Sequence, residues 1–216
     1  MNEKYGKTLT ILLIVAIVAV MAILGYVGVK YYKNYLTNNE ARKYVDKYEE
    51  EAKSKEKGKS GEYDIMDVGD GGKINTGPAK SELPKYKGFD VIGTIEIPKT
   101  DAKYPILLKV TVQSLNASVA KLSGGNLNEP GNVTIGGHNY RNGTFFSNNY
   151  KLEEGDTIYI TDNSGKKVTY TIYKKYNTDP EDISYQSRDT QGKREISLTT
   201  CNDDSSQRII ILAKEK

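Results

Sequence analysis

The sequence contains one cysteine, Cys201, and one histidine, His138, and Arg208 follows the cysteine at short range. A thiol, an imidazole and a guanidinium are sufficient for nucleophilic attack on an acyl group. The thiol attacks as a thiolate, the imidazole moves the protons, and the guanidinium offers hydrogen-bond donors to a developing oxyanion. Since the chain has no second cysteine or histidine, nearly any cysteine-dependent mechanism has to use these residues.

Each of the three residues also has a purely structural interpretation. A lone cysteine is often a small buried apolar residue. His138 beside two glycines could be an ordinary loop residue, and Arg208 could be a surface charge. Their ordered combination is what favours chemistry over packing.

The composition excludes several classes of protein. The formal net charge of +3 comes from 31 basic and 28 acidic side chains that are intermixed, so we expect no nucleic-acid partner. A single cysteine forms no internal disulfide, and one cysteine with one histidine rules out zinc sites built from several such ligands.

An apolar run near the amino terminus predicts a membrane anchor. The segment from Leu9 to Val29 carries no charged side chain, and about 20 apolar residues suffice for a helix to cross the hydrocarbon core. We expect a cytoplasmic tail at residues 1–7, a transmembrane signal anchor at 8–29 and an extracellular remainder. A cleaved signal peptide is the alternative, although the run is long for one.

Residues 30–86 are rich in charged and small polar residues and are predicted to form a charged stalk followed by a flexible linker. Because this stretch has few aliphatic side chains, we expect it to bury little surface. It would carry a folded head, residues 87–216, away from the bilayer.

The head is predicted to be mostly β, because short runs of β-branched residues alternate with turn signals. We expect roughly eight strands in a barrel, with a helix over Val112–Leu122. His138 follows one predicted strand, Cys201 ends another and Arg208 begins the next. Because strand ends and the adjoining loops display reactive groups, we expect the three side chains to meet at one cleft.

The segment Leu198-Thr199-Thr200-Cys201, with Arg208 leading the next strand, resembles the active-site signature of the sortases, the cysteine transpeptidases of Gram-positive cell surfaces. The family pattern is Thr-Leu-x-Thr-Cys, and Ser197 stands here where the first threonine is usual. Two further segments resemble the family's histidine segment and its first strand: Gly137-His138 and Gly93-Thr94-Ile95-Glu96-Ile97-Pro98.

The resemblance implies a closed eight-stranded β-barrel with short helices, and it implies roles for the residues. Cys201 forms a thioacyl intermediate with a C-terminal sorting signal of Leu-Pro-x-Thr-Gly type, His138 acts as acid and then as base, and Arg208 holds the substrate or its oxyanion. Substrate binding falls to Thr200, Leu198 and Thr199.

The implied partners are surface proteins that carry such a signal. The implied acceptor is an amine of a peptidoglycan precursor or of a pilin. The subclass most in keeping with the sequence is a housekeeping-like or class D-like anchoring enzyme.

No metal or organic cofactor is expected for the chemistry itself. A calcium site at Asp179, Glu181 and Asp182, like one in some family members, is a weaker alternative, since carboxylates in a polar loop are usually only solvated. Two other functions stay open: a cysteine hydrolase that releases peptides to water, and a non-enzymatic surface-binding module with a structural cysteine.

Overall fold

A computed structural model describes residues 3–58 and 83–216. The chain divides into two units, Met1–Asn39 and Glu40–Lys216. Helix α1 (Glu3–Gly58) begins in the first unit and continues into the second, which contains every strand of the described residues. Most of the predicted linker, residues 59–82, lies outside the described residues.

The first unit consists of the apolar part of α1. The stretch Tyr5–Ser54 includes a window of 18 residues with mean hydropathy 2.9, and the side chains of that window are not buried. Length and composition are those of a helix that can cross a membrane. Because an exposed apolar helix is unfavourable in water, this part of the chain could serve as a membrane anchor.

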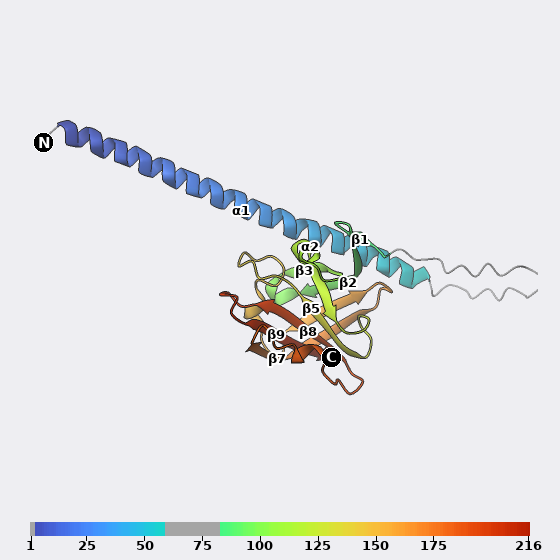
Figure 1. Ribbon diagram of the computed structural model, residues 1–216. Coiled ribbons are helices and arrows are strands. Elements are labelled where there is room, and N and C mark those ends of the chain that lie inside the picture. The colour runs from blue at the N-terminus through green and yellow to red at the C-terminus, as the bar shows by residue number, and fades with distance from the viewer. Residues whose placement is uncertain (1–2, 59–82) are drawn as a thin grey trace, which may run out of the picture. The chain divides into compact units, whose positions relative to one another are not determined.

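Eight strands of the second unit close into a barrel (Figure 1). Around the barrel their order is β2-β3-β4-β5-β8-β9-β7-β6, and the pairing of β2 with β6 closes the ring. The prediction of a closed eight-stranded β-barrel is therefore confirmed. The strands are β2 (Phe89–Ile97), β3 (Ala102–Leu107), β4 (Val119–Ser123), β5 (Gly131–Gly136), β6 (Thr157–Asp162), β7 (Lys167–Thr178), β8 (Arg194–Cys201) and β9 (Arg208–Glu215).

Short elements connect these strands. Strand β1 (Lys85–Tyr86) adds to the edge of β2. The connections contain one short α-helix, α2 (Val112–Ala117), and three 3₁₀ turns, η1 (Pro98–Thr100), η2 (Asn149–Lys151) and η3 (Ser184–Gln186). None of these elements is long enough to interrupt the barrel wall.

Alternate residues of the strands fill the barrel interior, as the period of two requires. Fully buried examples, each with no exposed surface, are Ile95, Ile106, Ile135, Ile160, Leu198 and Ile211. Burial of these apolar side chains is the main term that favours the closed barrel.

The predicted helix over Val112–Leu122 is only half correct. Helix α2 ends at Ala117, and Ser118 has an extended backbone conformation. The following residues form β4, in which Val119 and Ala120 are fully buried and pair with β3 and β5. Apolar residues at helical spacing predict one continuous helix, but pairing with two neighbouring strands overrides that local preference.

The second unit also includes part of the predicted stalk. Ala41, Val45, Tyr48 and Ala52 of α1 are buried, and their spacing places them on one face of the helix. The Tyr44 ring meets the Tyr86 ring edge-on, with centroids 4.9 Å apart. The predicted stalk is expected to bury little surface. Two small alanines and the tyrosine rings nevertheless give this part of α1 a buried face.

Ion pairs surround this packed face. Arg42 is paired with Asp101 at 2.5 Å, and Lys103 with Asp46 at 2.7 Å. The hydroxyl of Tyr48 donates a hydrogen bond to the side-chain oxygen of Asn163 in the β6–β7 turn. The folded head of the structure therefore begins near Glu40, earlier than the predicted residue 87.

Candidate active site

Strands β5 and β8 are parallel neighbours, and their carboxyl ends lie side by side. Gly136 pairs with Thr199, and the Gly137 amide donates a hydrogen bond of 3.2 Å to the Thr199 carbonyl oxygen. His138 therefore leaves β5 beside the point where Cys201 ends β8. The sheet thus brings the backbone at His138, the chain's single histidine, close to the backbone at Cys201, its single cysteine.

Arg208 is placed by the antiparallel partner of β8. In the register of β8 with β9, Cys201 is directly opposite Arg208. Side chains of directly opposite residues leave the sheet on the same face, with Cβ atoms typically about 4.5–5.5 Å apart. The structure therefore brings Cys201, His138 and Arg208 to one end of the barrel, as predicted from strand ends.

The reactive side chains are on the outer face of the barrel wall. Along β8, Ile196 and Leu198 belong to the interior cluster, so alternation puts Thr199 and Cys201 on the other side. Cys201, His138 and Arg208 are each only partly buried. Cys201 is therefore not a fully buried residue, as a cysteine that served only for packing would be expected to be.

The three residues predicted to bind substrate divide between the two faces. Leu198 has no exposed surface and packs in the interior cluster, so its predicted contact with substrate is not supported by its position. Thr200 also follows the interior alternation, while Thr199 shares the outer face with Cys201. The hydroxyls of Thr199 and Thr200 are buried and have no hydrogen-bond partner among the residues that the structure describes.

The loop that carries His138 is attached to the strand that carries Cys201. The side-chain amide of Asn139 donates hydrogen bonds to the Cys201 carbonyl oxygen (3.0 Å) and to Asp203 Oδ1 (2.9 Å). The Asn139 side-chain oxygen accepts a hydrogen bond from the Arg141 amide at 3.0 Å. These contacts hold the backbone next to the imidazole at a set position relative to the thiol.

The aromatic ring of Tyr140 lies beside the imidazole of His138. The Tyr140 ring lies 4.9 Å from the His138 ring between centroids, and the Tyr140 hydroxyl donates a hydrogen bond to Asn116 Oδ1 at 2.7 Å. Burial lowers the pKa of His138 below its usual value, because desolvation disfavours the charged imidazolium. Partial burial thus favours the neutral ring, the form that can accept a proton.

The carboxylates considered for calcium are used within their own turn. Asp179 Oδ1 accepts a hydrogen bond from the Glu181 amide, and Asp182 accepts hydrogen bonds from the Thr178 hydroxyl and the Ser184 amide. These bonds lower the pKa of Asp182. Among residues 3–58 and 83–216, no group of three or more histidine, cysteine, aspartate or glutamate side chains is arranged to hold a metal ion.

Comparison with known proteins establishes the family of this chain. A family model described as the sortase domain matches residues 95–216, which is more than half of the chain. The chain belongs to the sortase family. Sortases are cysteine transpeptidases, so the outer-face thiol lies in a protein whose family acts through a thiol.

Individual sortases are similar over part of their length. Sortase A of Bacillus anthracis is 31% identical over 124 residues, covering 56% of this chain and 58% of that protein. The chain thus spans less than two thirds of that curated relative. Sortase A from Corynebacterium diphtheriae, as a lid mutant, gives a TM-score of 0.55 at 30% identity, covering 64% of this chain and 74% of that structure.

A second solved structure supports the fold alone. The Sortase D5 transpeptidase of Clostridium perfringens gives a TM-score of 0.59 and covers 82% of this chain and 99% of that structure. Its sequence is only 23% identical.

Two residues of this sortase were not found from the sequence. Asn139 could have been noticed, because an asparagine directly after a loop histidine is well placed to bond neighbouring backbone. Arg188 carries no such signal. Its partners come from three separate strands, and only the folded sheet brings them together.

Proposed function

We propose that this sortase is a membrane-anchored cysteine transpeptidase that acts on a sorting signal of Leu-Pro-x-Thr-Gly type. The observation that carries the proposal is the juxtaposition at one barrel end. Cys201 is opposite Arg208 on adjacent strands, and His138 follows the parallel strand on the other side. The partial exposure of all three side chains supports the proposal as well.

The first half of the reaction forms a thioester. His138 accepts the proton of the Cys201 thiol, and the sulfur attacks the carbonyl carbon of the signal's threonine. Arg208 donates hydrogen bonds to the resulting oxyanion or to the substrate backbone. When the intermediate collapses, the carbon–nitrogen bond to the next residue breaks, and the imidazolium of His138 gives its proton to the departing amine.

The second half transfers the acyl group. An acceptor amine, from a peptidoglycan precursor or a pilin, loses a proton to His138 and attacks the thioester carbon. The carbon–sulfur bond breaks, and the departing Cys201 sulfur takes that proton from the His138 imidazolium, which restores the thiol and the neutral ring. The product is a new amide bond, and the enzyme returns to its starting state without a cofactor.

The proposed location is the cell membrane, with the barrel outside the cell. The apolar part of α1 supports this proposal, and so do the tyrosines at its carboxyl-terminal side. Tyr26, Tyr31, Tyr32 and Tyr35 are all strongly exposed. Tyrosine is enriched where membrane and water meet, because its ring is apolar and its hydroxyl is polar.

The test uses the full chain in detergent micelles with a fluorogenic Leu-Pro-x-Thr-Gly peptide, with and without an added amine. We expect an amine-dependent ligation product and an acyl mass adduct on Cys201. Cys201→Ala should abolish turnover, and His138→Ala and Arg208→Lys should each lower it by about a hundredfold or more. Arg194→Lys, at the far end of β8, is the matched control and should retain turnover.

Two outcomes point to other functions. Peptide release that is independent of the amine would identify a cysteine hydrolase that uses the same residues. An intact peptide, together with a Cys201→Ala variant that differs only in stability, would identify a binding module with a structural cysteine.

A further inference from the structure

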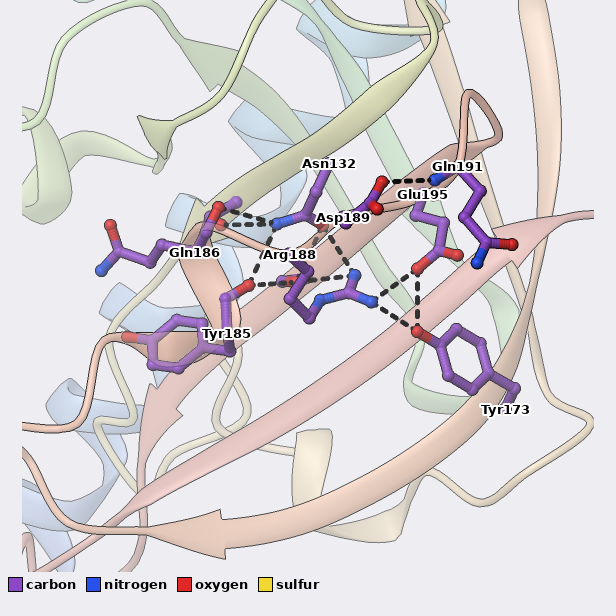
Figure 2. Close-up of polar contacts among 10 residues, drawn as sticks. Asn132, Tyr173, Tyr185, Gln186, Arg188, Asp189, Gln191 and Glu195 are labelled. Atoms are coloured by element: carbon purple, nitrogen blue, oxygen red, sulfur yellow. Dashed lines mark hydrogen bonds and ion pairs between the residues drawn. The ribbon is translucent and has the colours of Figure 1, made fainter.

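The guanidinium of Arg188 is the centre of a polar cluster on the outer face of the barrel (Figure 2). One terminal nitrogen donates to Glu195 Oε2 at 2.6 Å and to the Tyr173 hydroxyl at 2.5 Å. The other donates to Asn132 Oδ1 at 2.8 Å and to Ser197 Oγ at 3.3 Å. The cation therefore joins its own connecting segment to strands β5, β7 and β8.

The charges of this cluster are shielded from water. The side chains of Arg188 and Glu195 are only 18% and 12% exposed. The Tyr173 hydroxyl donates a hydrogen bond of 2.8 Å to Glu195 and so satisfies the carboxylate further. A shielded pair of this kind is costly to break, because loss of one partner leaves the other charge uncompensated.

The groups that Arg188 orients in turn hold the backbone of the connecting segment. Asn132 donates hydrogen bonds to the carbonyl oxygens of Tyr185 (3.0 Å) and Gln186 (3.2 Å). Ser197 Oγ donates to the Tyr185 carbonyl oxygen at 3.0 Å. Figure 2 shows Tyr185 and Gln186 on one side of the guanidinium and Glu195 with Tyr173 on the other.

Apolar packing fixes the same segment from a second direction. The Tyr185 side chain is buried against Ile210 and Leu212 of β9. Because side chains alternate along β9, Ile210 and Leu212 lie on the same outer face as Arg208. Residues 179–193, which we call the β7–β8 segment, therefore cover the sheet on the same face as the candidate active site.

Strand β8 connects the part of the sheet that the β7–β8 segment covers with Cys201. Ser197 and Cys201 are on one face, and four residues of an extended strand span about 13 Å. An extended peptide of about four residues has the same length. The β7–β8 segment therefore lies as far from Cys201 as the upstream residues of a bound substrate would lie from the bond that is cleaved.

We propose that Arg188 is a positioning residue that holds the β7–β8 segment as a preformed wall of the peptide cleft. This inference rests on the proposed function. If the wall is fixed before the peptide arrives, binding does not have to order it, and the affinity for peptide is higher. Arginine suits this task because its planar fork presents several donors at once, whereas lysine is a point charge on a flexible stem.

The test compares variants of the full chain in detergent micelles. Arg188→Lys keeps the charge and removes the fork. The double variant Arg188→Gln with Glu195→Gln removes both charges, so that no unpaired carboxylate is left buried. Arg194→Lys is the matched control, because Arg194 also pairs with a glutamate, Glu215, but does so at the start of β8 in a more exposed position.

Two measurements are made on each variant. Amide hydrogen exchange reports the order of residues 184–186 without any need for activity, and steady-state kinetics with the Leu-Pro-x-Thr-Gly peptide give KM and kcat. We expect exchange at residues 184–186 to become about tenfold faster in both Arg188 variants. We expect KM to rise about tenfold while kcat stays within about threefold, because the reacting groups are untouched. The control should change neither.

Unchanged exchange at residues 184–186 would overturn the inference, and so would a fall in kcat at unchanged KM. A wild-type enzyme that leaves the peptide intact would instead refute the proposed function. In that case the exchange measurement still decides whether Arg188 holds the segment.

Discussion

Replacing Asn139 by alanine should uncouple the histidine loop from the cysteine strand. The Asn139 amide donates to the Cys201 carbonyl oxygen at 3.0 Å and to Asp203 Oδ1 at 2.9 Å, and alanine can make neither bond. The variant leaves all three candidate catalytic side chains in place. Any loss of turnover therefore reports their alignment.

The expected size follows from the two lost bonds. A typical intramolecular hydrogen bond contributes about 1 kcal/mol net, and a bond to a charged acceptor contributes more. Because Asp203 is exposed, we count about 1 kcal/mol for each bond and about 2 kcal/mol in total. Since each 1.36 kcal/mol corresponds to a factor of ten, kcat/KM should fall about 30-fold if alignment requires both bonds.

The assay is the kcat/KM of peptide cleavage by the full chain in micelles, with the melting temperature measured in parallel. Asn163→Ala is a matched control. Asn163 also makes two hydrogen bonds, with Tyr48 and the Val91 carbonyl oxygen, but in the β6–β7 turn at the other end of β7. It should lower the melting temperature and leave kcat/KM nearly unchanged. A fall of less than threefold for Asn139→Ala would refute the reasoning.

Four further predictions concern stability, pH and metal dependence. Val45→Ala should lower the free energy of unfolding of the barrel unit by about 2 kcal/mol, because a fully buried side chain loses two methyl groups. Urea titration measures this change, and an unchanged free energy of unfolding would exclude the packing of α1. Gly165→Ala should lower the free energy of unfolding by about 1 kcal/mol or more in the same measurement. Gly165 has φ +91°, and an added Cβ would lie 2.9 Å from the Ala52 carbonyl oxygen. A more stable variant would contradict this reasoning. The His138 pKa is lowered in the folded protein, so below about pH 6.5 the unfolded chain binds more protons and the free energy of unfolding decreases as the pH is lowered. His138→Asn should remove that part of the pH dependence of unfolding, and identical curves for the two proteins would oppose it. A chelator should change kcat/KM by no more than about twofold, because Asp182 already accepts hydrogen bonds from Thr178 and Ser184 within its own turn. A large loss of kcat/KM that calcium restores would refute this.

Local pattern was sufficient for the barrel strands and for the choice of reactive residues. The period of two in β8 and β9 follows from chain geometry alone, so runs such as Ile209 to Ala213 are recognisable as strands. The single cysteine and single histidine left no choice of nucleophile or base. The long apolar helix near the amino terminus was equally predictable, because its length and lack of charge are properties of one continuous segment.

Non-local pairing decided the features that the sequence did not predict. Val119 and Ala120 became a strand because β3 and β5 offered hydrogen bonds on both sides. The face of α1 around Val45 is buried because Tyr86 and neighbouring residues of the barrel receive it, and a charged segment with scattered alanines carries no strong apolar stripe.

The distribution of the Leu198–Cys201 residues between the inner and outer faces of the barrel wall has the same physical basis. The order of Leu198, Thr199 and Cys201 is written in the sequence, but which of them face the interior depends on how the sheet curves and closes. Arg188 is the clearest case, since each of its partners is on a strand and the guanidinium reaches them only after the sheet has formed. The sequence alone determined which groups are available for chemistry. Closure of the barrel decided which of them meet, because contacts between distant residues depend on the arrangement of the whole sheet.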